Sequence, residues 1–286
     1  MTESLIPNVF SCDVEDWHQA YFKTEEVSDR CYVNTMSCLE ILDENDVRGT
    51  FFIQGLVADQ RPEVVRAIQQ GGHEIQTHGY SHRLTWDLGP KGFREDLERS
   101  IKILEDIIGK QITGFRAPCF SITRNEWWAF DIMGELGLSY DSSIFPMRTL
   151  RYGFHYDPGY SIINLRSPDS AVIEELPVSV LGDGRFRLPV GGGGYLRLLP
   201  VSFLSAALRR INKAGRPFVL YCHPYEFDPD EFKKMSAAVP LARRWHQQTF
   251  RASVPRKLVA LFQSAPFTTL ENVLEFERGR QRKETL

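Results

Sequence analysis

The sequence predicts an α/β fold in which a parallel β-sheet carries helices on its outer side. Short runs of β-branched and aromatic residues alternate with amphipathic segments along most of the chain. Several of the β-type runs end in polar residues, which is where a parallel sheet places a binding site. The 286 residues are 42% hydrophobic and 25% charged, a composition typical of a globular protein with a sizeable core.

The first five expected elements alternate strand and helix. Residues 8–12 (NVFSC) form a short β-type run, and 34–45 has apolar residues at helical spacing until polar residues end it. The run 48–53 is β-branched and aromatic without alternation, as in a strand buried on both faces. A proline opens the expected helix at 62–70 and two glycines close it, which leaves 73–77 as the third strand.

The later elements continue this order with a less regular middle. The helix expected at 92–109 has apolar residues at three- and four-residue steps and a terminal glycine. The other expected elements are strands at 112–119, 138–140, 173–180 and 216–222, and helices at 125–136, 201–213, 254–263 and 270–276. We expect a single domain over residues 1–286, with an insertion at 227–249 and a C-terminal helical extension at 250–286.

Composition excludes several classes of protein. A net charge of −3 and a pI near 6.2 offer no electrostatic footprint for nucleic acid. No apolar stretch approaches the roughly 20 residues of a membrane-spanning helix, and the N-terminus lacks a basic region followed by a long apolar one. The five cysteines are odd in number and have no CxxC spacing, which suggests neither a disulfide framework nor a cysteine zinc site. We therefore expect an unprocessed cytoplasmic protein with reduced thiols.

The segment 72–82 (GHEIQTHGYSH) carries the clearest chemical signal. It places His78 and His82 four residues apart, directly after a β-type run. Imidazole is the commonest side-chain ligand for Zn²⁺, and a catalytic zinc takes three protein ligands and keeps one position open. The sequence therefore predicts a metal centre whose third ligand is a carboxylate.

Carboxylates cluster at the end of the first strand, where Asp13, Glu15 and Asp16 fall within four residues. Like charges this close repel one another, so the cluster is typical of a cation site or of acid–base chemistry. Spacing favours Glu15 as the metal ligand, whereas alternation along an extended segment favours Asp16, so both stay open.

Later strands also end in polar residues, namely Arg116, Asp141 and His223. Because the carboxyl ends of parallel strands meet at one edge, we expect these side chains to gather with the histidines and carboxylates. Such a set predicts a metal-dependent hydrolase.

At these residues the sequence resembles the polysaccharide deacetylase family, whose catalytic unit is the NodB homology domain. The five family motifs appear in order over residues 8–226. The first, Asp-Asp or Asp-x-Asp, is represented by Asp13-Val14-Glu15-Asp16, and the second, His-[Ser/Thr]-x-x-His, by His78-Gly79-Tyr80-Ser81-His82. The third, Arg-x-Pro, is Arg116-Ala117-Pro118, the fourth is represented by Asp141, and the fifth, Leu-x-His, by Tyr221-Cys222-His223. Gly79 replaces a hydroxyl residue, and Phe145 stands where the fourth motif has Trp.

The resemblance implies a distorted (β/α)7-type barrel. The DVEDW opening, the GGGGY segment and the C-terminal extension are similar to the subgroup found with bacterial exopolysaccharide synthesis loci. The implied reaction removes an N-acetyl group from an amino sugar in a polysaccharide or glycolipid precursor.

Amide hydrolysis requires an activated water, a site for negative charge and a proton for the leaving amine. One divalent transition metal, Zn²⁺ first with Co²⁺ or Ni²⁺ as alternatives, is expected between His78, His82 and the acidic ligand. Asp13 is the expected general base, and Arg116 is expected to pair with it and hold it ionised.

The proton donor is expected on the far side of the barrel. His223 would be the general acid, and a neighbouring Asp141 would raise its pKa. By resemblance, the backbone N–H of Cys119 would assist in stabilising the oxyanion.

The expected partner is an N-acetylated sugar or oligosaccharide, and the oligomeric state is not indicated. Two alternatives stay open: cleavage of another C–N bond, as in a cyclic ureide, and a carbohydrate-binding module without catalysis. The glycine run 191–194 fits either close approach to a sugar ring or a hairpin turn. Trp17 and His18, beside the acidic cluster, are candidates for sugar contacts.

Overall fold

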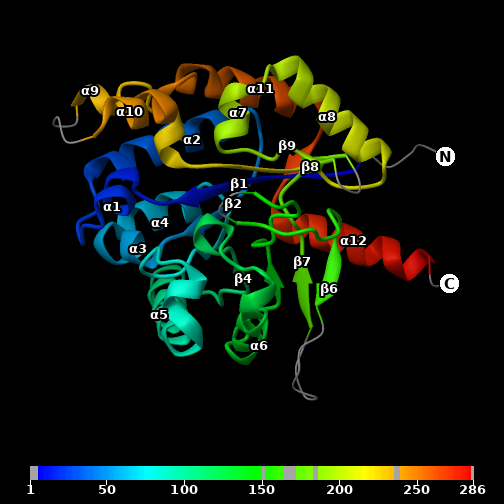
Figure 1. The fold of residues 1–286 in the computed structure, drawn as a ribbon, viewed down its shortest axis with the longest axis horizontal. Coiled ribbons are helices and arrows are strands. Elements are labelled where there is room, and N and C mark those ends of the chain that lie inside the picture. The colour runs from blue at the N-terminus through cyan, green and yellow to red at the C-terminus, as the bar shows by residue number, and fades with distance from the viewer. Residues whose placement is uncertain (1–5, 150–151, 164–171, 183–185, 235–238, 285–286) are drawn as a thin grey trace.

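The computed structural model describes residues 6–149, 152–163, 172–182, 186–234 and 239–284 (Figure 1). Seven strands pair in parallel in the order β10-β1-β2-β3-β4-β5-β7, antiparallel β6 lies at the edge, and β11 pairs with the start of β1. The strands are β1 (Asn8–Val14), β2 (Thr50–Ile53), β3 (Glu74–Thr77), β4 (Gly114–Phe115), β5 (Tyr140–Asp141), β6 (Ser161–Ile163), β7 (Ile173–Glu175), β8 (Val180–Leu181), β9 (Leu188–Pro189), β10 (Val219–Cys222) and β11 (Phe267–Thr268). This curled sheet confirms the predicted (β/α)7-type barrel.

Helices cover the outer side of the sheet. They are α1 (Trp17–Phe22), α2 (Asp29–Glu44), α3 (Gly55–Gln60), α4 (Pro62–Gln70), α5 (Thr85–Ile108), α6 (Trp128–Glu135), α7 (Gly194–Leu198), α8 (Val201–Lys213), α9 (Glu231–Lys234), α10 (Leu241–Gln248), α11 (Val254–Ser264) and α12 (Leu270–Glu284), with 3-10 turns η1 (Pro118–Phe120), η2 (Arg124–Glu126), η3 (Pro224–Phe227) and η4 (Arg251–Ser253). None of the helices in the described ranges is long and apolar enough to cross a membrane.

Strand β1 shows how the sheet separates two environments. Successive side chains point to opposite faces of a strand. Phe10, Cys12 and Val14 therefore pack in the cluster beneath the helices, whereas Val9 belongs to the cluster inside the curled sheet. Asp13 lies on the same face as Val9, so strand alternation directs it into the barrel.

Most predicted elements are present, with shifted ends. The α8 helix coincides with the prediction, and α4 begins at Pro62 as expected. By contrast, α5 begins seven residues early because a kink at Gly89 (φ 64°, ψ 176°) joins a preceding turn to the predicted helix. The short helices α1 and α3 were not predicted, since neither is long enough to show a helical period.

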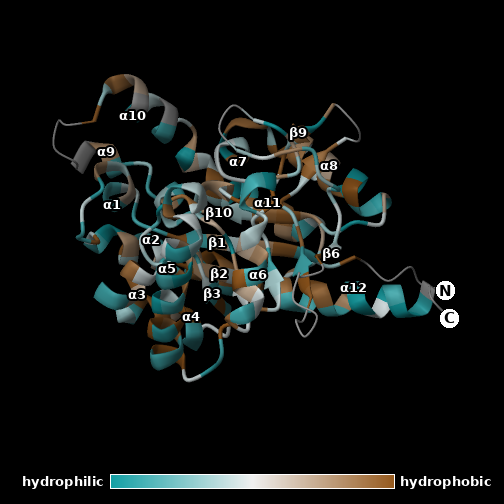
Figure 2. Cartoon of the chain, turned by 60° about the horizontal axis from the view of Figure 1, so that its bottom comes forward, coloured by the Kyte–Doolittle hydropathy of each residue, from teal (hydrophilic) through white to brown (hydrophobic). Residues whose placement is uncertain are grey.

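The predicted insertion and extension both pack onto the barrel. The Trp17 ring of α1 stacks with Tyr21 and contacts Phe232 of α9 edge-on, with centroids 4.8 Å apart, and α9 lies beside α1 in Figure 2. Trp17 is therefore a packing residue, which corrects its prediction as a sugar contact. Helix α12 buries Leu270 and Val273 in the interior cluster, so it closes one end of the barrel.

His73, just before β3, makes stability depend on pH. Its Nδ1 accepts the N–H of Gly49 at 3.2 Å, and its ring packs on Phe51 with centroids 5.0 Å apart. Burial, aided by the charge of Arg48, lowers the pKa of His73 from 6.5 to about 4. Between pH 6.5 and 4 the unfolded chain therefore binds more protons at this residue than the folded chain, so stability falls as the pH falls.

We expect His73→Gln to remove this part of the pH dependence. The difference in pKa corresponds to about 3 kcal/mol for a fully buried ring, and because His73 is only partly buried we expect about 1–2 kcal/mol. Urea unfolding of both proteins at pH 7.5 and 4.5 measures it, and the comparison cancels other groups that titrate in this range. Equal losses of stability in the two proteins would contradict the prediction.

Candidate active site

Three potential metal ligands meet at the carboxyl ends of β1 and β3. The ligand atoms of Glu15, His78 and His82 lie within 4.8 Å of one another. Nε2 of His78 is 3.8 Å from Oε2 of Glu15, and Nε2 of His82 contacts the same oxygen. Glu15 and His78 are buried, and the His82 side chain is 12% exposed. The structure therefore brings the two predicted histidines together with one carboxylate.

Asp16 does not join this group, which corrects the prediction that left it open as a metal ligand. It is the N-cap of α1, and its two carboxylate oxygens accept the backbone N–H groups of His18 at 3.1 Å and Ser28 at 2.6 Å. An N-cap carboxylate satisfies helix-terminal donors. Its role is to hold the turn that presents Glu15.

The His78 ring is held in one tautomer. Its Nδ1 lies 2.7 Å from the carbonyl oxygen of Arg116, and a carbonyl can only accept. Burial lowers the pKa of His78 to about 4, so the ring is neutral and its Nε2 keeps a lone pair directed at Glu15. A backbone carbonyl on the distal nitrogen is the usual support of a metal-binding histidine.

The loop carrying the second histidine is fixed by a residue that the sequence analysis did not identify. Asp96 of α5 accepts the backbone N–H groups of Tyr80 at 2.6 Å and Ser81 at 3.0 Å. Gly79 has a φ of +72°, and a Cβ there would lie 2.9 Å from Asp96. This explains why glycine replaces the hydroxyl residue of the family motif.

The donor set fits a divalent transition metal. Two imidazoles and one carboxylate are the ligands of many catalytic zinc sites, which keep further positions open. Nε2 of His82 is buried, and it lies against the same Glu15 oxygen that Nε2 of His78 faces. A cation bound between Glu15, His78 and His82 would satisfy that nitrogen and offset the negative charge.

The predicted base is paired as expected. Nη1 of Arg116 donates to Oδ1 of Asp13 and to the hydroxyl of Ser11, both at 2.8 Å. The Arg116 guanidinium is fully buried, lies 4.3 Å from the centroid of Phe52 and also binds the carbonyl and hydroxyl of Ser142. Asp13 therefore has a fixed orientation inside the barrel.

His223 has a different carboxylate partner from the one predicted. Nδ1 of His223 is 3.6 Å from Oε2 of Glu226, and that oxygen also accepts the His223 backbone N–H at 3.1 Å. Burial by itself would lower the pKa of His223, but the carboxylates of Glu226 and Glu15 outweigh it and the pKa is raised. Arg197 of α7 donates to the other oxygen of Glu226 at 3.1 Å and holds this carboxylate in place.

Asp141, the predicted partner of His223, instead supports the turn after β4. Its two oxygens accept the N–H of Ser143 at 2.9 Å and the hydroxyl of Ser143 at 2.5 Å. The Ser143 hydroxyl in turn accepts the N–H of Ala117 at 2.7 Å. Burial and the charge of Asp141 raise the pKa of neighbouring Glu175 well above its ordinary value.

The remaining candidates take structural places or stay predictions. Cys119 lies exposed in η1 with a φ of +53°, and its oxyanion role stays a prediction. In the glycine run, a Cβ on Gly192 would lie 1.8 Å from the carbonyl oxygen of Tyr221. The run therefore allows close backbone approach to β10, where the Gly193 N–H donates to that oxygen at 3.0 Å. His18 packs on Phe22 with centroids 4.8 Å apart.

Exchanging the carboxylate beside His223 should move the pH profile of activity. Glu226→Gln removes a negative charge that raises the pKa of His223. The pKa of His223 should therefore fall, and a general acid at this position deprotonates at lower pH. We expect the alkaline limb of kcat to shift to lower pH and kcat at pH 8 to fall about 10-fold or more. The control is Asp141→Asn, which should leave this limb in place. A shift in the control but not in Glu226→Gln would restore Asp141 as the partner.

Two family models match the chain. One is described as polysaccharide deacetylase and matches residues 28–139, and the other, a domain of unknown function (DUF3473), matches residues 142–275. A peptidoglycan deacetylase-like protein from Gibberella zeae is 32% identical over 108 residues, 37% of this chain and 31% of that protein. A peptidoglycan deacetylase from Helicobacter pylori is 29% identical over 120 residues, 42% of this chain and 34% of that protein. The chain thus spans about a third of the length of these relatives.

Solved structures share the fold. A Mycobacterium smegmatis protein assigned to the polysaccharide deacetylases is 21% identical, with a TM-score of 0.66, over 98% of this chain and 93% of that one. A CE4 family pseudoenzyme from Bacillus anthracis is 13% identical, with a TM-score of 0.53, over 95% of this chain and 66% of that one. Strand β5 lies between the two matched segments and joins them in one sheet, because it pairs with β4 of the first segment and β7 of the second. The chain therefore resembles the polysaccharide deacetylase family, whose model matches residues 28–139, and it shares the fold of solved structures from that family.

Proposed function

We propose that this protein is a metal-dependent hydrolase that removes N-acetyl groups from an amino sugar of a polysaccharide or of its precursor. One observation carries the proposal: a candidate metal triad, base and acid face a single point. The Glu15 carboxylate is 3.8 Å from Nε2 of His78 on one side and 3.9 Å from Nε2 of His223 on the other. The acid and the triad therefore flank the space where a substrate amide would lie.

Asp13 faces the same space. Burial lowers the pKa of His78, and the negative charge of Asp13 opposes this shift. The same charge helps to raise the pKa of His82 and of His223. The charge of Asp13 therefore acts on all three histidines. Its partner Arg116 holds the carboxylate in a fixed orientation, so Asp13 can take a proton from a water that attacks the acyl carbon.

Glu15, His78 and His82 would hold a divalent cation, which when bound would polarise the acyl oxygen and the attacking water. His223 donates a proton to the departing amine, and Glu226, which Arg197 holds in place, orients His223 and raises its pKa. The base and one metal ligand come from the end of β1, the two histidine ligands from the end of β3, and the acid from the end of β10. This division explains why the residues are spread from residue 13 to residue 226.

The substrate class follows from the relatives. Two curated proteins that the chain resembles are named as peptidoglycan deacetylase or peptidoglycan deacetylase-like, and peptidoglycan carries N-acetylated amino sugars. We therefore propose an N-acetylated amino sugar as substrate, and a place in exopolysaccharide assembly on the resemblance of the DVEDW and GGGGY segments. The expected cytoplasmic location stays a prediction.

A non-catalytic carbohydrate-binding role is the second candidate. One solved neighbour is described as a pseudoenzyme, so the fold by itself does not decide between catalysis and binding. Here the triad, the Asp13–Arg116 pair and the His223–Glu226 pair are all present. A binder has no use for both a base and an acid, which favours the enzyme.

Metal content and acetate release test the proposal. After loading with Zn²⁺, Co²⁺ or Ni²⁺, the wild type is expected to hold about one ion per chain and to release acetate from chitooligosaccharides or peptidoglycan strands. Glu15→Gln and the double variant His78→Ala/His82→Ala should lose the ion, and activity should fall by about 10³-fold or more.

Asp16→Asn is the matched control, since it alters the neighbouring carboxylate outside the triad. It should keep the ion and lose about 1 kcal/mol of stability, because the amide NH2 that replaces one oxygen cannot accept the N–H of Ser28. If the wild type binds none of the three ions, the result favours the non-catalytic carbohydrate-binding role. Loss of the ion in Asp16→Asn with its retention in Glu15→Gln would reverse the ligand assignment.

A further inference from the structure

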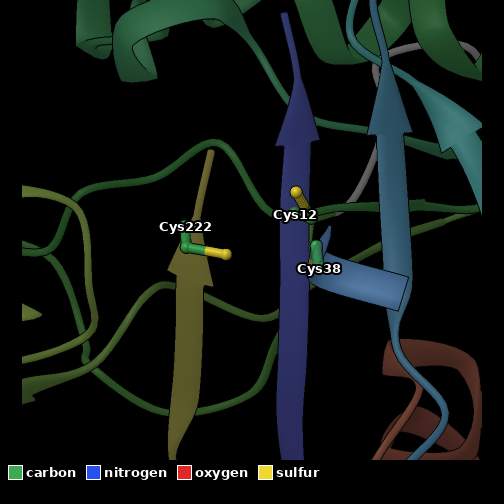
Figure 3. Close-up of side chains that lie close together, drawn as sticks. All are labelled: Cys12, Cys38 and Cys222. Atoms are coloured by element: carbon green, nitrogen blue, oxygen red, sulfur yellow. The ribbon is translucent and has the colours of Figure 1, made fainter. Parts of the chain in front are cut away.

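Three cysteines that the proposed mechanism does not use converge on the outer face of the sheet. Cys12 of β1, Cys38 of α2 and Cys222 of β10 have sulfur atoms within 4.8 Å of one another, and all three are completely buried (Figure 3). The sequence suggested no cysteine metal site because these residues lie far apart along the chain. Their convergence is a product of the tertiary structure alone.

The backbone builds this cluster. Cys12 and Cys222 are register partners on adjacent parallel strands, so their side chains leave the same face of the sheet. The sulfur of Cys222 points toward β1 in Figure 3, and α2 brings Cys38 over the same face. The next residues on the two strands, Asp13 and His223, face the opposite way. The cluster thus lies directly behind the predicted base and acid.

The geometry suits a three-coordinate soft cation. An ion bound about 2.3 Å from each of three sulfurs in one plane requires sulfur separations of about 4 Å, which the observed limit of 4.8 Å allows with small adjustments. Among the described residues, no fourth cysteine, histidine or carboxylate belongs to this group. Zinc in a closed structural site takes four ligands, whereas thiolates also select Cu(I), which accepts three.

We propose that Cys12, Cys38 and Cys222 form a buried binding site for one soft monovalent cation of the Cu(I) class. The cation keeps its oxidation state. Each thiol that binds as thiolate breaks its S–H bond and releases one proton to solvent as its bond to the cation forms. This site is separate from the histidine centre and does not depend on the proposed deacetylase activity.

The three thiols differ in pKa. Burial raises the pKa of Cys12 and of Cys222 well above the ordinary value. Burial would do the same to Cys38, but hydrogen bonds from the other two thiols lower its pKa to about 6. Cys38 is the one ligand that comes from α2 and not from the sheet, so its removal leaves two sulfurs on neighbouring strands.

Cu(I) titration of the reduced protein tests the site. The titration is done without oxygen, against a competing Cu(I) chelator such as bicinchoninate, in the His78→Ala/His82→Ala background, which removes the other metal centre. One Cu(I) per chain, with a new thiolate-to-copper absorption in the ultraviolet and a raised Tm, is expected. Cys38→Ala should weaken binding by about 100-fold or more. Cys31→Ala should not, because Cys31 lies on the same helix and is also buried but is not part of the cluster.

Two results would overturn the proposal. One is no Cu(I) uptake from the chelator by the reduced protein, and the other is equal loss of binding in Cys38→Ala and Cys31→Ala. If Cys38→Ala fails to fold, X-ray absorption of the copper-loaded His78→Ala/His82→Ala protein decides instead. Three sulfur neighbours support the site, and nitrogen or oxygen neighbours reject it.

Discussion

Asp13→Asn is expected to lower kcat/KM for acetate release by about 10²–10⁴-fold while the protein keeps its metal. Asparagine has the shape of aspartate and can still accept a hydrogen bond from Arg116. In the wild type, Nη1 of Arg116 is 2.8 Å from Oδ1 of Asp13. It cannot take a proton from water. The change therefore removes the proposed base without opening a cavity or removing a ligand of the triad.

Three measurements separate this explanation from simpler ones. Metal content should stay at about one ion per chain, because Asp13 is not among the converging ligands. The far-ultraviolet circular dichroism should be unchanged, and Asp16→Asn, which changes a buried carboxylate three residues away, should retain activity. Loss of the metal in Asp13→Asn would make Asp13 a ligand, and near wild-type activity would remove its role as base.

Arg116→Met is expected to cost about 3–5 kcal/mol of stability. The guanidinium is fully buried and binds Asp13, Ser11 and Ser142. Methionine fills much of the same volume but leaves the Asp13 carboxylate buried without its cation. Breaking one side of a buried ion pair is costly because the remaining charge is not compensated.

A double-variant cycle isolates the charge from the packing. Asp13→Asn/Arg116→Met removes both charges, so we expect it to be more stable than Arg116→Met alone. Urea unfolding measures the free energies, and an unchanged dependence on urea concentration shows that the same surface is exposed in each variant. A double variant as unstable as the sum of the two single ones would mean that the pair contributes packing and not charge compensation.

The sequence by itself determined the parallel sheet and the positions of most site residues. Buried parallel strands read as unbroken apolar runs, and site residues follow them directly, so residue type and position were enough for Asp13, Arg116 and His223. The two histidines were equally visible, since His78 and His82 lie on one short loop. These features are local, so they can be recognised in the sequence without knowledge of contacts between distant residues.

The choice between neighbouring carboxylates was decided by loop conformation. Glu15 and Asp16 are adjacent in the sequence. At the start of α1, Glu15 turns toward the histidines and Asp16 caps the N-terminal end of the helix. Likewise, Glu226 reaches His223 because the 3-10 turn η3 brings residues three apart together. A capping-box spacing in His-Pro-Tyr-Glu could have indicated this contact. Asp141 looked equivalent by position, but its oxygens are taken up by Ser143.

The cysteine cluster could come only from the tertiary structure. Cys12 and Cys222 are 210 positions apart and meet because β10 pairs with β1 in one particular register. A shift of one residue in that register would turn Cys222 to the opposite face of the sheet. Strand pairing depends on the packing of the whole barrel, and no local pattern in the sequence records it.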